Sequence, residues 1–240
     1  YGGWPKDKNT VFRIIGGKDL VIDGRGSTLM IHGLHQPFYL ENCRNVTIRN
    51  LKIDWKQPPA MTGKVVAREG RHIDVEILDD VPVAGGEPFF ALQTYDPKTW
   101  LPTASETFAG VQSTELLRPK VLRLNMTNDG RGNIHAPVGW LLAMRHILVG
   151  CEPFEVRECD GVRLEDVDLY SGPGMGITGV GTKDISLHRV RIIRKPGSKR
   201  IVSTTGDATH FINCSGTIEL KDGKTSIEVK WGTIPNDGSR

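Results

Sequence analysis

The run Ser203-Thr204-Thr205-Gly206-Asp207-Ala208-Thr209-His210-Phe211-Ile212-Asn213-Cys214 brings one carboxylate, one histidine and four hydroxyl groups together in the sequence. It enters an apolar alternation at Phe211. Polar clusters at the mouth of a buried strand often carry chemistry, and a carboxyl group with an imidazole can transfer protons. The same residue types also form turns that satisfy their own backbone, and the composition of the run alone favours that reading. The predictions from this run are a partly exposed Asp207 at the mouth of a groove, with His210 close to it.

The elements that would position this run repeat along the chain. Each repeat has a polar pair followed by alternating apolar residues, and the spacing is 26 residues from Leu20 to Val46 and 23 from Val162 to Ile185. The chain also has 28 glycines and 14 prolines between short β-branched runs, which is typical of an all-β protein. A period in the low twenties without helices predicts a parallel β-helix, because a β-sandwich would need hairpin turns about every 8–12 residues. In the last repeat Ile218, not Thr217, is the apolar residue, so a slip of one position is expected there.

The repeat is interrupted over residues 56–150. This segment has strand patterns of its own, at 63–67, 72–78 and 89–94, and it is too long for a loop. The sequence therefore predicts four parts. They are first β-helix coils at 1–55, an inserted antiparallel and barrel-like β subdomain at 56–150, later coils at 151–220 and a divergent tail at 221–240. The tail alternates over 225–231, which predicts a strand that caps the last coil, or self-association of the chain through that end.

Composition excludes some classes of protein. Apolar residues make up 38% and charged residues 25%, and the formal net charge is +3, so no nucleic-acid partner or membrane surface is expected. No apolar stretch approaches the ~18 residues of a membrane span. Four cysteines could form two disulfides. However, Cys43, Cys159 and Cys214 hold the same place in three repeats, which with Cys151 favours buried free thiols.

Two further patterns have competing interpretations. Asp54-Trp55 ends a coil, and the pair is either a capped turn with a packed indole or a stacking platform for a sugar; the first is favoured. His32 and His35 have the spacing of metal ligands only on a helix. On a strand they would face opposite sides, so no metal site is predicted.

Several segments together resemble glycoside hydrolase family 110, the exo-acting α-1,3-galactosidases. The resemblance extends in order from Phe12 to Gly216. It is carried by Ile22-Asp23-Gly24-Arg25-Gly26-Ser27, His32-Gly33, the stretch from Pro37-Phe38 to Asn50, Ile53-Asp54-Trp55, Pro173-Gly174-Met175-Gly176, and Val202 to Phe211.

The resemblance implies a right-handed parallel β-helix with inserted β domains and an extracellular or periplasmic protein. It implies removal of terminal α-1,3-linked galactose with inversion, from an oligosaccharide or polysaccharide, without a cofactor or a metal. Asp207 matches the general acid of the family. We expect Asp54, Trp55, Thr205 and His210 to bind the substrate.

The chain departs from the family at the second catalytic group. About one coil after the acid, the family has an adjacent pair of aspartates, whereas this chain has Glu228-Val229-Lys230-Trp231. An inverting glycosidase needs a second carboxylate to activate water, so the general base is unassigned and poor hydrolysis by this chain is expected. The alternative is a non-catalytic carbohydrate-binding or structural β-helix. A polysaccharide lyase on the same scaffold is less favoured, because the sequence has no acidic cluster of the calcium-binding kind.

Overall fold

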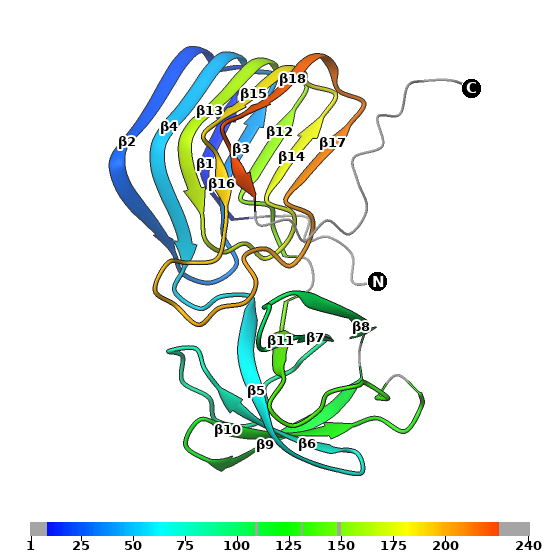
Figure 1. The fold of residues 1–240 in the computed structure, drawn as a ribbon. Coiled ribbons are helices and arrows are strands. Elements are labelled where there is room, and N and C mark those ends of the chain that lie inside the picture. The colour runs from blue at the N-terminus through cyan, green and yellow to red at the C-terminus, as the bar shows by residue number, and fades with distance from the viewer. Residues whose placement is uncertain (1–8, 109, 131, 148–149, 226–240) are drawn as a thin grey trace, which may run out of the picture. The chain divides into compact units, whose positions relative to one another are not determined.

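The computed structural model describes residues 9–108, 110–130, 132–147 and 150–225. These residues form two compact units. Unit 1 is drawn from Tyr1–Pro58, Val149–Arg194 and Ser203–Arg240, and unit 2 from Pro59–Leu148 and Lys195–Val202. The described residues contain strands and no helix (Figure 1), so the prediction of an all-β fold is confirmed.

Unit 1 has two sheets whose strands are all parallel. One sheet has the order β1-β3-β12-β14-β17, with bounds Thr10–Ile15, Gln36–Glu41, Phe154–Arg157, Ile177–Val180 and Thr209–Ile212. The other joins β2, β4, β13, β15 and β18 with the short β16 and β19. Their bounds are Lys18–Ile31, Arg44–Trp55, Asp160–Leu169, Lys183–His188, Ser215–Lys221, Arg191–Ile192 and Lys224–Thr225. The chain passes alternately from one sheet to the other, so residues one repeat apart lie on neighbouring strands.

Unit 2 has one antiparallel sheet of seven strands, in the order β8-β7-β11-β5-β6-β10-β9. The bounds, taken in the order of the sheet, are Pro102–Phe108, Ala91–Tyr95, Leu141–Arg145, Ala60–Glu69, His72–Ile77, Val121–Met126 and Val111–Arg118. Residues of Lys195–Val202 also pack in this unit, because Ile201 and Val202 join a cluster with Tyr95 and Leu141. No helix among the described residues is long and apolar enough to cross a membrane.

Single residues with positive φ mark the corners of unit 1. Such residues occupy equivalent positions in successive repeats and form three rows, with φ between 49° and 74°. Row A follows the strands of the first sheet, row B comes one residue into the strands of the second, and row C lies where those strands bend. Row A is Gly16, Asn42, Glu158, Gly181 and Asn213; row B is Asp19, Asn45, Gly161, Asp184 and Gly216; row C is Arg25, Asn50, Asp166, Arg189 and Asp222. Apart from Arg25, Glu158 and Arg189 these are Gly, Asn or Asp, the residues that adopt the left-handed conformation most readily.

A ladder of small side chains lies between rows A and B. It contains Cys43, Cys159 and Cys214, with Gly17 and Thr182 at the equivalent positions of the other repeats. The backbone N–H of Cys43 points at the sulfur of Cys159, and that of Cys159 donates to the hydroxyl of Thr182. All four cysteines are free, and three of them are buried. The prediction of free thiols is therefore confirmed, and burial is confirmed for all but Cys214, which is half-buried; Cys151 lies outside the ladder.

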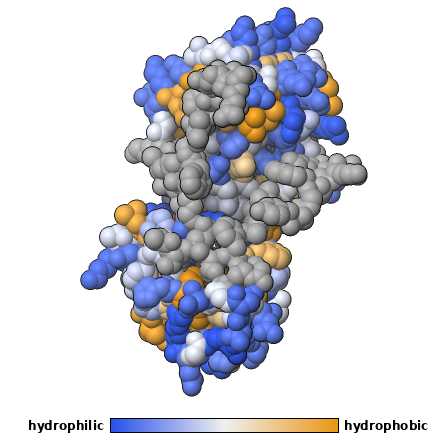
Figure 2. All heavy atoms as spheres, turned by 90° about the vertical axis from the view of Figure 1, so that its right-hand side faces the viewer, coloured by the Kyte–Doolittle hydropathy of each residue, from blue (hydrophilic) through white to orange (hydrophobic). Residues whose placement is uncertain are grey.

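Large apolar side chains fill the interior of unit 1. Phe38 and Phe154 are 0% exposed, and the rings of Phe12, Phe38 and Phe154 stack with centroids 4.9 and 5.0 Å apart. At the other end of the stack, Ile185 of β15 pairs with Ile218 of β18 after a shift of register, as the slip in the sequence predicted. Figure 2 looks onto that end, where hydrophobic residues are interspersed among hydrophilic ones; Ile212, Ile218 and Leu220 are exposed there.

The predicted cap at 225–231 lies outside the described residues, except for Thr225 at the end of β19. The tail carboxylates Glu228 and Asp237 lie outside them as well.

Candidate functional site

Asp207 lies just before β17, the last strand of the five-stranded sheet. The backbone of 203–208 runs beside that of 172–177. Thr205 N–H donates to the carbonyl of Gly172, Gly206 N–H to that of Gly174, and Gly176 N–H to that of Asp207, over 3.1, 2.9 and 2.8 Å. Asp207 is therefore held by a backbone ladder that continues directly into the sheet.

Glycines permit this close approach of two backbones. A Cβ at Gly176 would lie 2.5 Å from the carbonyl oxygen of Ala208, and one at Gly206 would lie 3.1 Å from the carbonyl carbon of Gly174. The distance at Gly176 is shorter than real Cβ atoms show, and the one at Gly206 is tighter than nine in ten real Cβ contacts. Side chains here would therefore push the Asp207 segment away. The Gly-Pro-Gly-Met-Gly run at 172–176 thus fixes the place of the carboxylate.

Asp207 and His210 are in contact. The Nδ1 atom of His210 is 3.1 Å from Oδ2 of Asp207, and the two side chains are 38% and 30% exposed. The predicted proximity and partial exposure are thereby confirmed. That the pair stands at the mouth of a groove stays a prediction.

His210 belongs to a row of polar side chains that crosses the sheet. Strand register places Tyr39 beside Glu155, Glu155 beside Thr178, and Thr178 beside His210. Their neighbours in sequence, such as Phe38, Phe154 and Ile177, point into the core. Because side chains alternate along a strand, the polar row, with His210, lies on the face of the sheet that points away from the core.

A buried polar cluster occupies part of this row. Glu155 is 5% exposed; its Oε2 accepts from Gln36 Nε2 over 2.9 Å, and its Oε1 accepts from Arg157 Nε over 2.6 Å. The hydrogen bond to Glu155 raises the pKa of Arg157. Burial, with a hydrogen bond to Glu41 and the negative charges of Glu41 and Glu155, raises the pKa of Tyr39. Glu155 is thus a fixed, paired carboxylate.

The arrangement offers one accessible acid and one fixed negative group. Asp207 is exposed to solvent and hydrogen-bonded to an imidazole, so it can exchange a proton with a bound molecule. Glu155 lies two strands from His210, and neighbouring strands are ~4.8 Å apart, which separates the two backbones by ~10 Å. The described residues contain no group of three or more His, Cys, Asp or Glu side chains that could hold a metal ion.

The other predicted binding residues lie elsewhere or are buried. Asp54 is 0% exposed and its Oδ1 accepts from the N–H of Trp55, while Trp55 is 2% exposed and its Nε1 donates to the carbonyl of Gly33. Both are on β4, in the second sheet, and the indole packs in the core. The favoured interpretation, a packed indole, is therefore confirmed over the stacking platform. Thr205 is next to the site but only 6% exposed.

Sequence reasoning missed Gln36, Glu155 and Thr178. The signal was the alternation of Phe154-Glu155-Val156-Arg157, in which every second residue is charged. Four residues are a weak strand pattern, and their distance in sequence from Asp207 concealed the relation.

Comparisons with known proteins give a consistent result. The chain is 32% identical to α-1,3-galactosidase A of Shewanella woodyi, over 94% of this chain and 40% of that protein. It is 29% identical to α-1,3-galactosidase B of Bacteroides thetaiotaomicron, over 85% of this chain and 36% of that protein. For α-1,3-galactosidase A of Bacteroides fragilis the identity is 27%, over 83% and 35%. No protein-family model matches the chain.

The predicted resemblance is confirmed by these relatives, of whose length the chain spans 35–40%. Over most of its own length, the chain is similar to the α-1,3-galactosidases.

Proposed function

We propose that the chain is part of a glycoside hydrolase that removes terminal α-1,3-linked galactose from a carbohydrate, with Asp207 as the general acid. The observation that carries the proposal is the partly exposed Asp207–His210 pair, in a chain similar to proteins named α-1,3-galactosidase. An oligosaccharide or polysaccharide with terminal α-galactose is the proposed substrate. An extracellular or periplasmic location is proposed with it.

The proposed scaffold of unit 1 is a right-handed parallel β-helix. Two observations support it: strands one repeat apart pair in parallel register, and three rows of left-handed residues recur at equivalent corners. A crossover between parallel strands is right-handed in nearly all proteins. We further propose that unit 2 is an inserted β domain, since its main segment lies between β4 and β12.

In the proposed reaction Asp207 protonates the glycosidic oxygen as the bond to the galactose breaks. Water attacks the opposite face of the sugar, activated by a second carboxylate that an inverting enzyme places about 6.5–9.5 Å from the acid. His210 orients the Asp207 carboxyl through its 3.1 Å contact. Glu155 is a poor base, because both of its oxygens already accept charged or amide hydrogen bonds. The base stays unassigned.

The test combines binding with hydrolysis of galactose-α-1,3-galactose. The variant is Asp207→Asn, and Asp160→Asn is the control, since Asp160 is a half-buried aspartate of unit 1 at the start of β13. We expect the disaccharide to shift NMR signals of His210 and its neighbours in both proteins. Residual hydrolysis should fall about 10²–10⁴-fold in Asp207→Asn alone.

Two outcomes would overturn the proposal. One is a disaccharide that fails to bind, or that shifts only signals far from His210. The other is hydrolysis that Asp207→Asn and Asp160→Asn leave equally unchanged. Binding at His210 with no measurable hydrolysis in any protein would support the site and assign the chain to the non-catalytic alternative.

A further inference from the structure

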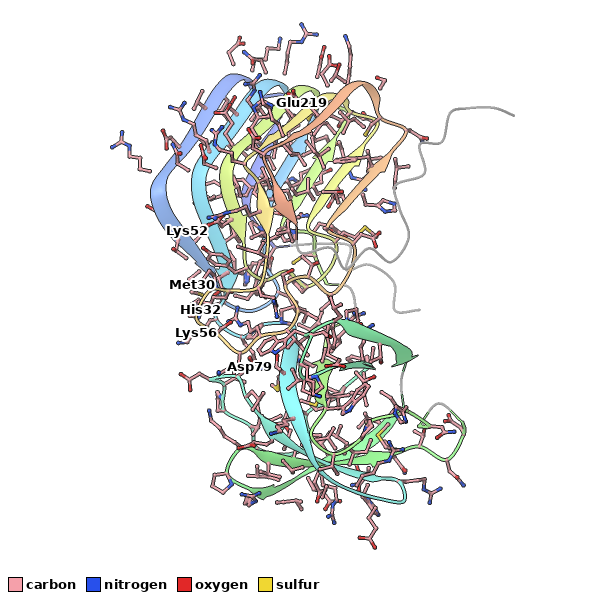
Figure 3. All side chains as sticks on the ribbon, viewed as in Figure 1. Met30, His32, Lys52, Lys56, Asp79 and Glu219 are labelled. Carbon is pink, nitrogen blue, oxygen red and sulfur yellow. The ribbon has the colours of Figure 1, made fainter. Side chains whose placement is uncertain are left out.

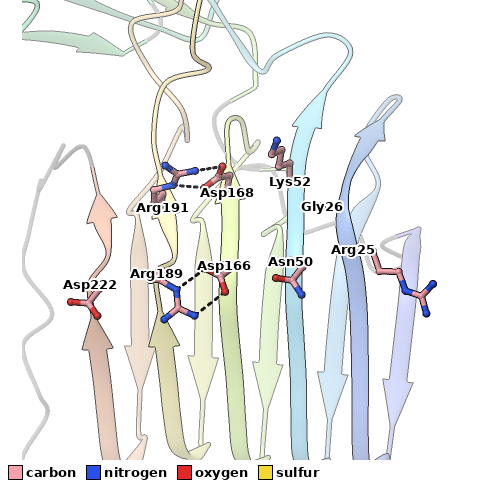
Figure 4. A pocket seen from close by; sticks show the side chains of 9 residues that line it. All are labelled: Arg25, Gly26, Asn50, Lys52, Asp166, Asp168, Arg189, Arg191 and Asp222. Carbon is pink, nitrogen blue, oxygen red and sulfur yellow. Dashed lines mark hydrogen bonds and ion pairs between the residues drawn. The ribbon is translucent and has the colours of Figure 1, made fainter.

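A hollow in unit 1 lies on the sheet that does not carry Asp207. It has a volume of about 650 Å³ and follows row C, where β2, β4 and β13 bend. Figure 4 shows it from close by. The lining residues are Arg25, Gly26, Asn50, Lys52, Asp166, Asp168, Arg189, Arg191 and Asp222. Apart from Gly26, every lining side chain is charged or an amide, so the hollow suits a polar ligand.

Two bidentate ion pairs form one side of the hollow. Arg189 binds Asp166 through Nε and Nη2 over 2.6 and 2.8 Å, and Arg191 binds Asp168 in the same way over 2.5 Å. The hydroxyl of Tyr170 also donates to Asp168 over 2.9 Å. The hydrogen bond to Arg189 lowers the pKa of Asp166, and the hydrogen bond to Asp168 raises the pKa of Arg191. Each of the two carboxylates is thus already paired with an arginine.

Two cations of the hollow have no such partner. Within the part of the chain that the structure describes, neither Lys52 Nζ nor the guanidinium of Arg25 makes a hydrogen bond or an ion pair; only the backbone N–H of Arg25 donates, to Asp23. Both side chains are exposed, and Lys52 lies on the outer side of β4 (Figure 3). The lining has four cations and three carboxylates, and two of the carboxylates are paired. Positive charge is therefore in excess on the side of β2 and β4.

We propose that this hollow binds an anionic group of a glycan, a carboxylate or a sulfate ester, with Arg25 and Lys52 as the residues that hold the charge. Asp166 and Asp168 are each paired with an arginine, so the charge left without an ion pair on the side of β2 and β4 is positive. Here two cations border a hollow large enough for a sugar residue. The neighbouring ion pairs supply further N–H donors and carboxylate acceptors one strand away, about 4.8 Å, and a pyranose ring can span such a step. The choice of a glycan rests on the proposed function; the preference for an anion does not.

The experiment measures binding by affinity electrophoresis in gels that contain polygalacturonate, dextran sulfate or neutral dextran. The test variant is Arg25→Gln with Lys52→Gln. The matched control is Lys18→Gln with Arg44→Gln, because this pair also lies on β2 and β4, is exposed and loses the same charge, but is outside the hollow. We expect an anionic polymer to bind the unmodified chain, and the test variant to bind it about tenfold more weakly, a change of ~1.4 kcal/mol. The control should bind within twofold of the unmodified chain.

Each outcome has one meaning. Retardation by polygalacturonate assigns a carboxylate, retardation by dextran sulfate assigns a sulfate ester, and retardation by both assigns the shared negative charge. The proposal is overturned if neither polymer binds, if neutral dextran binds as well, or if the control weakens binding as much as the test variant. Asp207→Asn should leave this binding unchanged. Failure of the hollow is thus separated from failure of the hydrolase site, which the disaccharide reports.

Discussion

Substituting Phe38 by Ala should destabilise unit 1 more than the same change at either neighbouring phenylalanine. Phe38 is 0% exposed, and its ring lies between Phe12, at 4.9 Å and 10°, and Phe154, at 5.0 Å and 3°. Replacing a buried Phe by Ala costs about 3–5 kcal/mol. Each stacked pair contributes about 0.5–1.5 kcal/mol beyond the buried area, and Phe38 takes part in two.

We therefore expect Phe38→Ala to lower the free energy of unfolding of unit 1 by about 5 kcal/mol, the upper end of that range. Phe154→Ala, with one stack fewer, should lower it by ~4 kcal/mol. Phe12 is 39% exposed and has one partner, so Phe12→Ala should cost only ~2 kcal/mol. A domain is stable by about 5–15 kcal/mol, so Phe38→Ala can unfold the unit, and Phe38→Leu serves as the milder variant at ~1.5 kcal/mol.

The assay is urea unfolding with hydrogen exchange followed by mass spectrometry, because a chain with two units need not unfold in one step. Peptides from β12 and β14 report unit 1, and peptides from β6 and β10 report unit 2. An equal or smaller cost for Phe38→Ala than for Phe12→Ala, or a loss of protection in unit 2 instead, would contradict the stacking of Phe38 between two rings in the core of unit 1.

Three further predictions concern activity, thiols and pH. The chain should hydrolyse α-1,3-galactosides about 10²–10⁴-fold more slowly than an intact α-1,3-galactosidase measured in parallel, because general-base assistance contributes that factor to the rate. Equal rates would show that a carboxylate of this chain supplies the base. A thiol reagent at pH 8 should label at most Cys214 in the folded chain and all four cysteines after unfolding. The reason is that the other three cysteines are buried, and burial raises the pKa of Cys159 to about 11. Rapid labelling of Cys43 or Cys159 would contradict the internal ladder. Burial lowers the pKa of His146, whose Nδ1 has no hydrogen-bond partner among the described residues, so the unfolded chain takes up the proton first as the pH falls below 6.5. The urea midpoint of unit 2 should therefore drop between pH 7.5 and 5.5. His146→Phe should remove part of that drop, whereas His35→Ala, at a half-buried histidine of unit 1, should not.

The repeat was predictable because its corners need particular residues. Asn45, Gly161 and Asp184 recur at one position since the backbone turns left-handed there, and the apolar residue that follows each of them faces the core. Ile218 also indicated the bulge in β18, because only a shift of one residue brings it opposite Ile185. Corners and bulges of this kind can be predicted from the residue types at single positions.

Other features depend on contacts between distant residues and have no local signal. Lys195–Val202 packs with unit 2, partly because Ile201 N–H donates to the hydroxyl of Thr62, 139 residues away. The buried indole of Trp55 packs in the core and donates to the carbonyl of Gly33, 22 residues earlier in the chain. The polar row from Tyr39 to His210 exists only once the registers of four strands are known. Pairing across the sheet, rather than propensity, decides such features.

The three rows of left-handed corners also determine where the chain can change in length. Between Asn45 and Asn50 the side chains alternate between core and solvent, so losing one residue there would turn Val46 and Ile48 outward. The connection that leaves β4 and returns at β12 has no such constraint, because β12 pairs with β3 and β13 with β4 whatever lies between. Whole repeats can therefore be duplicated, and long segments can be inserted between two strands. The deletion of a single residue between two corners, in contrast, would shift the register of the rest of that strand.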